Sequence, residues 1–213
     1  MPRQCKCPKC GAELETPLGC GSCGVLFSPA PSPGPFEVFG LAPAFEVDAR
    51  ALKQRLLKLS RLLHPDYYAA GDDATRATAE RNTALLNESY DVLADPVQRA
   101  DWLVRSLGGP SESEQRGMPK AFLVEVLEWN ETLEAARESQ PSSPPRAALV
   151  QLDATLRAQR DDTLKTLGAL LTPLPPRAAP ALAEARAQLN ALRYLEKTLA
   201  DIEALSVEQA STR

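Results

Sequence analysis

The prolines of this 213-residue chain are clustered, and the clusters divide the sequence into segments. Proline removes a backbone donor and clashes with the preceding helical turn, so helices tend to end at these clusters. The stretches between the clusters carry leucine and alanine three or four residues apart, which is the spacing of an amphipathic helix. Only 5% of the residues are aromatic, which suits helix better than sheet. The sequence therefore predicts an all-α fold in which proline-rich joints separate the helices.

Shifts in composition predict how these segments are grouped into modules. A stretch rich in cysteine and glycine comes first, and a run that alternates proline with small residues follows it as a stiff, extended linker. Further along, prolines at 141–145 and 173–176 separate three helices. The predicted order is a four-cysteine zinc-binding module (1–27), a proline-rich linker (28–35), a helical hairpin domain (36–107), a second linker (108–119), a three-helix bundle (120–205) and a flexible tail (206–213).

Charge and hydropathy argue against several classes of protein. The formal net charge is -4, whereas a general nucleic-acid-binding protein is usually basic. No stretch approaches the roughly 18 apolar residues that cross a bilayer, and the first residues lack the apolar run of a signal peptide. We therefore expect a cytoplasmic protein that binds neither membrane nor nucleic acid, in a compartment where thiols stay reduced.

All five cysteines lie before residue 24, in a pattern typical of a metal site. Two C-x-x-C turns, Cys7/Cys10 and Cys20/Cys23, each aim two thiolates at one point, and each is followed by a glycine. Four thiolates with this spacing suit structural zinc, with no open position for catalysis. The alternatives are an iron–sulfur cluster and a redox-active C-x-x-C pair, although the βαβ setting of the redox motif is absent. Cys5 is left over and is predicted to be a free thiol.

A long helical hairpin is predicted after the first linker. Asp48 has N-cap chemistry and starts a basic helix, which ends where Pro65 forces the preceding residue out of the α region. A second helix is predicted over residues 73–94. The tripeptide His64-Pro65-Asp66 lies in the loop between the two helices, and by itself it is weak evidence of function. The apolar stripe of the first helix consists of Leu52, Leu56, Leu59 and Leu63.

The surroundings of the tripeptide resemble the J-domain family. Residues 36–41 precede the basic helix as the short first helix of a J domain does, and residues 87–96, followed by Arg99, continue the family pattern. The resemblance covers residues 36–107 and implies a hairpin whose tip and basic helix dock on an ATP-bound chaperone of the DnaK or HscA type. Complementary charge would chiefly speed and orient that encounter. The chaperone-binding residues implied by position are His64, Pro65, Asp66, Lys53, Lys58 and Arg61.

The helix predicted after the second linker has two apolar faces. At ~100° per residue, Val124 and Leu127 lie well away from the main apolar stripe and stand beside acidic side chains. One packed face cannot bury both, so the helix is either sandwiched between two others or carries an exposed docking surface. In the last helix, Tyr194 lies about 200° from Leu192 and thus outside that helix's stripe. The two stripes consist of Phe122, Val126, Trp129 and Leu133, and of Ala185, Leu189, Leu192, Leu195, Leu199 and Ile202.

With these helices included, residues 36–205 resemble the HscB-type iron–sulfur co-chaperones. The resemblance rests on residues 39–48, on residues 96–103, on Phe122-Leu123 with the acidic residues that follow, and on residues 192–197. Members of that family bind an IscU-type cluster scaffold on their C-terminal helices and bring it to an HscA-type ATPase. The scaffold-binding residues implied by position are Leu123, Val124, Leu127, Glu128, Glu131 and Tyr194.

The resulting hypothesis is a co-chaperone that stimulates the ATPase of a partner and is not itself an enzyme. The chain has no phosphate-binding loop, and its single histidine has no recognisable nucleophile or carboxylate partner for catalysis. The alternatives are a general J-domain adaptor that delivers unfolded clients to a DnaK-type chaperone, a zinc-ribbon nucleic-acid protein and a dithiol oxidoreductase. The sequence leaves the oligomeric state open between a monomer and a weak dimer.

Overall fold

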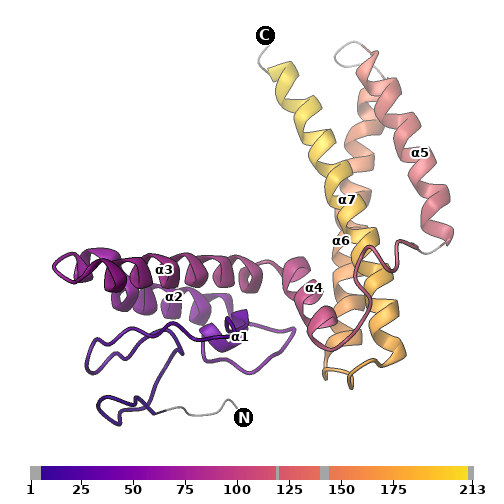
Figure 1. Cartoon of the computed structure of the whole chain (residues 1–213). Coiled ribbons are helices and arrows are strands. Elements are labelled where there is room, and N and C mark those ends of the chain that lie inside the picture. Colours follow the sequence, from indigo (N-terminus) through magenta and orange to yellow (C-terminus); the bar gives the residue numbers. More distant parts are fainter. Residues whose placement is uncertain (1–5, 119, 140–143, 211–213) are drawn as a thin grey trace. The chain divides into compact units, whose positions relative to one another are not determined.

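The computed structural model describes residues 6–118, 120–139 and 144–210, and its long regular elements are helices (Figure 1). The chain divides into two compact units, Met1–Trp102 and Leu103–Arg213. The described residues contain no β-strand, only three isolated antiparallel bridges in the cysteine-rich segment. The predicted all-α fold is therefore confirmed. Among the described helices, none combines the length and the apolar character that crossing a membrane requires.

The first long helix of the hairpin is α2 (Ala49–Leu63). The carboxylate of Asp48 accepts hydrogen bonds from two backbone N–H groups of its first turn, at 2.8 and 3.0 Å, as the N-cap prediction requires. The helix ends before His64, and a single 3-10 turn, η1 (Pro65–Tyr68), follows. Proline thus both stops the α-helix and starts the loop that turns the chain back.

The second long helix of the hairpin is α3 (Asp73–Ala94), which runs back along α2 (Figure 1). The carboxylate of Asp72 caps it by accepting the backbone N–H of Thr75 at 2.8 Å. Short α1 (Pro35–Val38) packs against α3, and α4 (Pro96–Ser106) follows α3 directly. The buried residues of α3 recur at alternating spacings of three and four: Ala79, Asn82, Leu86, Ser89 and Leu93.

The leucine stripe predicted for α2 faces this buried side of α3. Leu52, Leu59 and Leu63 are at most 3% exposed, and Leu56 is half-buried at the margin of the stripe. Phe36 of α1 completes the core, since it is buried and its ring centroid lies 5.3 Å from that of Trp102 in α4. Apolar burial of this kind stabilises the packing of α1, α2 and α3 against one another.

The second unit contains three longer helices, α5 (Lys120–Arg137), α6 (Pro144–Leu171) and α7 (Pro180–Ala210). They lie side by side as a bundle in which α6 contacts both of the others (Figure 1). The two apolar stripes predicted for α5 and α7 are buried in it. Pro144 begins α6, and the proline cluster at 173–176 falls at the predicted break between α6 and α7.

The segment between α4 and α5 is hydrogen bonded to α7. The Nε of Arg186 donates to the carbonyl of Pro110 at 2.8 Å, and this arginine side chain is completely buried. The Nδ2 of Asn190 donates to the carbonyls of Gln115 and Gly117, at 2.8 and 3.1 Å. The residues predicted as a linker are therefore fixed along the surface of the bundle.

Candidate functional site

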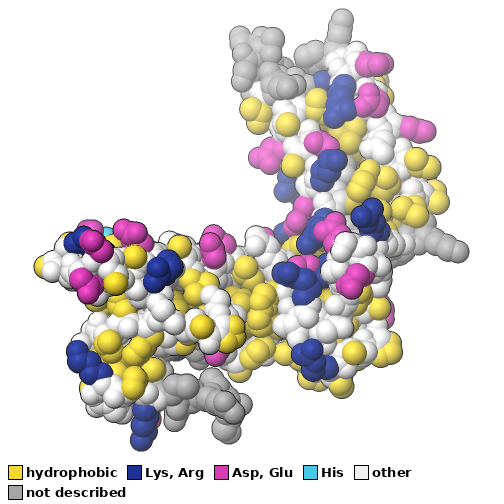
Figure 2. Space-filling view, viewed as in Figure 1, with side chains coloured by type: hydrophobic (Ala, Val, Ile, Leu, Met, Phe, Trp, Pro, Cys, Tyr) yellow, Lys and Arg dark blue, Asp and Glu magenta, His cyan; other side chains and the backbone are white. Residues whose placement is uncertain are grey.

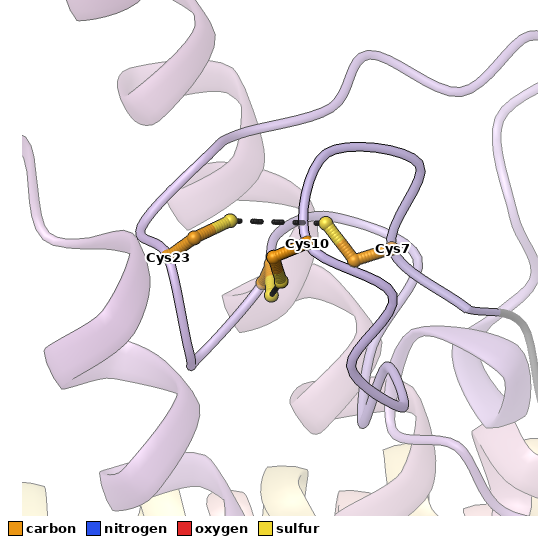
Figure 3. A group of neighbouring side chains, drawn as sticks. Cys7, Cys10 and Cys23 are labelled. Atoms are coloured by element: carbon orange, nitrogen blue, oxygen red, sulfur yellow. Dashed lines mark hydrogen bonds between the residues drawn. The ribbon is translucent and has the colours of Figure 1, made fainter.

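Four cysteine side chains converge in the first unit (Figure 3). The Sγ atoms of Cys7, Cys10, Cys20 and Cys23 all lie within 4.8 Å of one another, with Cys7 and Cys23 separated by 3.7 Å and Cys10 and Cys20 by 3.6 Å. A tetrahedral ion with Zn–S bonds of about 2.3 Å would separate its sulfur ligands by about 3.8 Å. The four thiols are therefore placed to hold a metal ion. Cys5 lies outside the described residues, so its prediction as a free thiol stays untested.

Each cysteine pair is held on a tight turn that requires glycine. The backbone N–H of Gly11 donates to the carbonyl of Cys7 at 2.8 Å, and that of Gly24 donates to the carbonyl of Cys20 at 2.9 Å. Both glycines have positive φ, 75° and 69°, where a side chain would be strained. A hydrogen bond from the backbone N–H of Cys23 lowers the pKa of the Cys20 thiol to about 6. At Cys10 a backbone hydrogen bond from Ala12 acts in the same direction, but partial burial and the neighbouring cysteine side chains outweigh it and raise the pKa to about 12. The lowered pKa favours the thiolate at Cys20, and the thiolate is the form that binds metal.

The cysteine module, residues 6–27, is held against the hairpin by Asn82 of α3. The Nδ2 of this buried side chain donates to the backbone carbonyls of Leu18 and Phe27, both at 2.9 Å. One carbonyl precedes the second cysteine pair and the other follows it, while the Leu18 side chain is completely buried. The module therefore packs on the hairpin as part of the same compact unit.

The tripeptide forms the tip of the hairpin, between α2 and α3. The Nδ1 of His64 accepts the backbone N–H of Asp66 at 3.2 Å and lies 3.6 Å from an oxygen of the Asp66 carboxylate. The side chains of His64 and Asp66 are 50% and 89% exposed. Both polar groups are thus held in a compact turn and remain open to solvent.

The three cations implied in chaperone docking lie on α2, but their surroundings differ. Lys53 and Arg61 are exposed, and the exposed Leu57 lies between them in sequence. Lys58 is also exposed, yet its Nζ lies 2.6 Å from a carboxylate oxygen of Glu15 in the cysteine module. One of the implied docking charges is therefore paired within the chain.

The two apolar faces predicted for α5 separate into a buried one and an exposed one. The side chains of Leu123, Val124 and Leu127 are 47%, 61% and 65% exposed, and Glu128 and Glu131 are exposed as well. Figure 2 shows hydrophobic side chains along the α5 side of this unit, with acidic side chains nearby. Large apolar side chains this exposed, with acidic neighbours, are typical of a binding surface.

Tyr194 of α7 packs against the buried face of α5. Its ring centroid lies 6.1 Å from that of Phe122 and 6.4 Å from that of Trp129. Its hydroxyl accepts a hydrogen bond from the Nδ2 of the exposed Asn130, at 3.4 Å. The residue is half-buried, so only part of it contributes to the surface beside α5.

Comparison with known proteins identifies the family. Residues 118–203 match the family model for the HSCB C-terminal oligomerisation domain. A co-chaperone protein HscB homolog from Shewanella sp. (strain ANA-3) is 34% identical over 139 residues, which are 64% of this chain and 78% of the relative. The homolog from Bordetella petrii is 35% identical over 137 residues, 64% and 77% of the two chains. The chain belongs to the HscB co-chaperone family.

Solved HscB structures share the fold. The human co-chaperone protein HscB superposes with a TM-score of 0.75 at 23% identity, over 95% of this chain and 99% of that one. The HscB chaperone from Vibrio cholerae gives 0.68 at 27% identity, over 83% and 99%. Coverage of 95% is too high for the whole cysteine module and its linker to lie outside the match with the human HscB. The shared fold therefore extends into the N-terminal part of this HscB chain.

Three residues that join the cysteine module to the hairpin were not singled out by sequence reasoning. They are Glu15, Tyr68 and Asn82, each of which bonds to a residue more than 40 positions away in the sequence. Asn82 had a usable signal, because it continues the three-and-four spacing of the buried stripe of α3. Glu15 and Tyr68 had none, since nothing local indicates which distant segment they contact.

Proposed function

We propose that this HscB-family chain is an adaptor in iron–sulfur cluster assembly. The exposed face of α5 binds an IscU-type scaffold, and the tip of the hairpin stimulates the ATPase of an HscA- or DnaK-type chaperone, so that the scaffold is delivered for cluster transfer. Zinc occupies the four cysteines in a structural role, and the protein acts in the cytoplasm, where such thiols stay reduced. ATP hydrolysis belongs to the partner chaperone.

The observation that carries this proposal is the exposure of two different surfaces on two different units. The first is the tip, where His64 and Asp66 are open to solvent at the end of a rigid hairpin. The second is the outer face of α5, where Leu127 is 65% exposed. A protein that brings one partner to another needs two such surfaces. Because the tip and the α5 face lie on different units, a partner can bind one of them without a change in the other.

The chemistry of the tip supports a stimulating role. His64 and Asp66 are held in one turn by a backbone hydrogen bond, so the imidazole and the carboxylate are presented together. The exposed cations of α2 that lead up to the tip supply a positive charge that would steer an acidic surface toward it. Because the tip offers only a few groups, it fits a positioning contact on a larger machine better than a catalytic site.

The chemistry of the α5 face supports a folded partner of defined shape. Leu123, Val124 and Leu127 supply an apolar centre, and Glu128 and Glu131 supply an acidic margin. Burying such a centre excludes water, while the margin favours a partner with basic residues at matching positions. A general adaptor for unfolded clients would need tolerance of many sequences and would gain little from a fixed acidic margin.

The test is to replace His64 by Gln in the full chain. We expect stimulation of the chaperone ATPase to be lost, while affinity for the IscU-type scaffold stays within about twofold, since α5 is untouched. Tyr67→Phe, a change in the neighbouring exposed residue, serves as the control and should keep both activities. Unchanged stimulation by the His64→Gln protein would overturn the proposal. Competition by a permanently unfolded polypeptide at the scaffold site would favour the general adaptor instead.

A further inference from the structure

The tip loop of the hairpin is bonded directly to the metal-binding turns. The hydroxyl of Tyr68 lies 2.9 Å from the carbonyl oxygen of Leu62 and 3.2 Å from that of Gly24. Its single proton is therefore shared between two acceptors in a three-centre bond. Leu62 lies two residues before His64, and Gly24 directly follows Cys23. One side chain thus joins the end of α2 to the second cysteine turn.

The backbone of the module also lies against the residue that precedes the tripeptide. A Cβ added to Gly19, the residue before Cys20, would lie 3.3 Å from Cδ2 of Leu63. Leu63 itself has no exposed surface, and its carbonyl accepts the hydroxyl of Thr83 at 3.0 Å. The last carbonyls of α2 lack partners within the helix, and the hydroxyls of Tyr68 and Thr83 donate to those of Leu62 and Leu63.

These contacts depend on the module being folded. A segment as short as residues 6–27 has little core of its own, so a metal ion bound at its four cysteines would add strongly to the stability that packing on the hairpin gives. When the module unfolds, Tyr68 loses the Gly24 carbonyl, Leu63 loses its contact with Gly19, and the buried amide of Asn82 loses both of its acceptors. All three losses occur within the hairpin that presents the tripeptide.

We infer that the four-cysteine site supports the tip of the hairpin: metal bound at the cysteines holds the His64–Asp66 loop in place, with Tyr68 as the positioning residue that connects them. The inference rests on the proposed function only in taking the tip as the stimulating element. The connection itself is a property of this chain alone, so it can be measured without either partner.

The single histidine of the chain makes the measurement direct, because its imidazole signals in an NMR spectrum need no assignment. The full chain is loaded with Zn²⁺ under reducing conditions, stripped with a chelator and reloaded. In the wild type, stripping should shift or broaden the His64 imidazole signals and speed amide exchange at Tyr67 and Ala69 by about twofold to tenfold, the range expected for one net hydrogen bond. Reloading should restore both.

Two variants isolate the connection. Tyr67→Phe removes the hydroxyl of a neighbouring tyrosine whose ring is exposed, and it should behave as the wild type does. Tyr68→Phe keeps the ring but removes the bridging hydroxyl. The His64 signals of the zinc-loaded variant should therefore already lie closer to those of the metal-free wild type, and they should change less when the metal is removed. If removal of the metal leaves the wild-type His64 signals and amide exchange rates unchanged, the inference that metal holds the His64–Asp66 loop in place is overturned. If Tyr68→Phe responds as fully as Tyr67→Phe, the role of Tyr68 is overturned.

An ATPase assay then separates this inference from the proposed function. Tyr68→Phe should lower the maximal stimulation at saturating co-chaperone by about twofold to tenfold, with little change in the concentration that gives half of the effect. A positioning defect in the tip lowers the maximal stimulation alone. A loss of docking would instead raise the half-effect concentration, and that result would count against the positioning role of Tyr68. A wild-type protein that stimulates no ATPase would overturn the proposed function but would leave the NMR result standing.

Discussion

The ammonium nitrogen of Lys58 lies 2.6 Å from a carboxylate oxygen of Glu15, so a cation of α2 is paired with the cysteine module. The backbone carbonyl of the same Glu15 accepts a hydrogen bond from the Nη2 of Arg55 at 3.3 Å. Lys58 is among the residues that we propose for chaperone docking, and in that role the module would compete with an acidic partner surface for this charge. Both side chains of the pair are more than half exposed, which makes the pair weak and displaceable.

Replacing Glu15 by Gln should therefore release Lys58 and speed association with the chaperone. An exposed pair of this kind corresponds to at most about fivefold, and the gain should shrink as salt is added. Stopped-flow association kinetics at two ionic strengths measure both effects. Glu13→Gln removes an exposed carboxylate from the same module and controls for net charge. Equal gains from the two variants would assign the effect to net charge and contradict the competition.

Replacing Leu127 by Ala should weaken scaffold binding without unfolding the bundle. Leu127 is 65% exposed, so the substitution should change the free energy of unfolding by no more than about 0.5 kcal/mol. If the side chain is a central contact, scaffold affinity should fall about tenfold or more in a calorimetric titration. Val150→Ala, at a 72% exposed position on α6, is the matched control and should bind as the wild type does. Equal affinities for the two variants would exclude this face of α5.

Replacing Asn82 by Ala should destabilise the attachment of the cysteine module. The substitution leaves the carbonyls of Leu18 and Phe27 without this donor, which should cost about 1–3 kcal/mol in the free energy of unfolding. Affinity for Zn²⁺ should fall too, because metal binding and folding of the module are linked. Denaturant unfolding and competition with a chromogenic chelator measure the two quantities. Asn87→Ala, at an exposed site on the same helix, should leave both unchanged, and matching losses in the two variants would refute a specific role for Asn82.

The hydroxyl of Tyr68 should give the hairpin tip a dependence on alkaline pH. Burial raises the pKa of Tyr68 above its ordinary value of 10.0, because the folded state favours the neutral phenol that donates the hydrogen bond. Its stabilising contribution is fully present below the unfolded pKa and is lost as the pH rises through the higher folded pKa. An ultraviolet titration of tyrosinate absorbance should show a component above the ordinary range that is missing in Tyr68→Phe. A titration curve of the same shape in the variant would contradict the shift.

Much of the hairpin could be predicted from local signals. Asp48 caps the start of α2, Pro65 stops it, and the predicted range 73–94 coincides with α3. The C-x-x-C turns and their glycines likewise indicated the convergence of four thiols. Helix caps, proline sterics and turn glycines act within a few residues of the chain, so they can be recognised in the local sequence.

Burial and exposure on α5 and α7 were predicted only in part. Helical periodicity separated the stripe of Phe122 and Trp129 from Leu127, but it left open whether a second helix covered the other face. The bundle covers one face and leaves Leu127 exposed. Tyr194 lies outside its own helix's stripe, as the periodicity predicts, yet it is half-buried because α5 packs over it. Periodicity gives the direction of a side chain, whereas only packing decides what lies in that direction.

The sequence by itself determined where the two long helices of the hairpin begin and end, which helix faces are apolar and which thiols come together, because these depend on backbone chemistry over one or two turns. Tertiary structure alone decided that the metal-binding turns rest against the end of α2 and that Tyr68, Asn82 and Glu15 connect them to the hairpin. A proline-rich linker fixes how far the module can reach but not the surface on which it packs, and that choice depends on contacts between residues more than 40 positions apart.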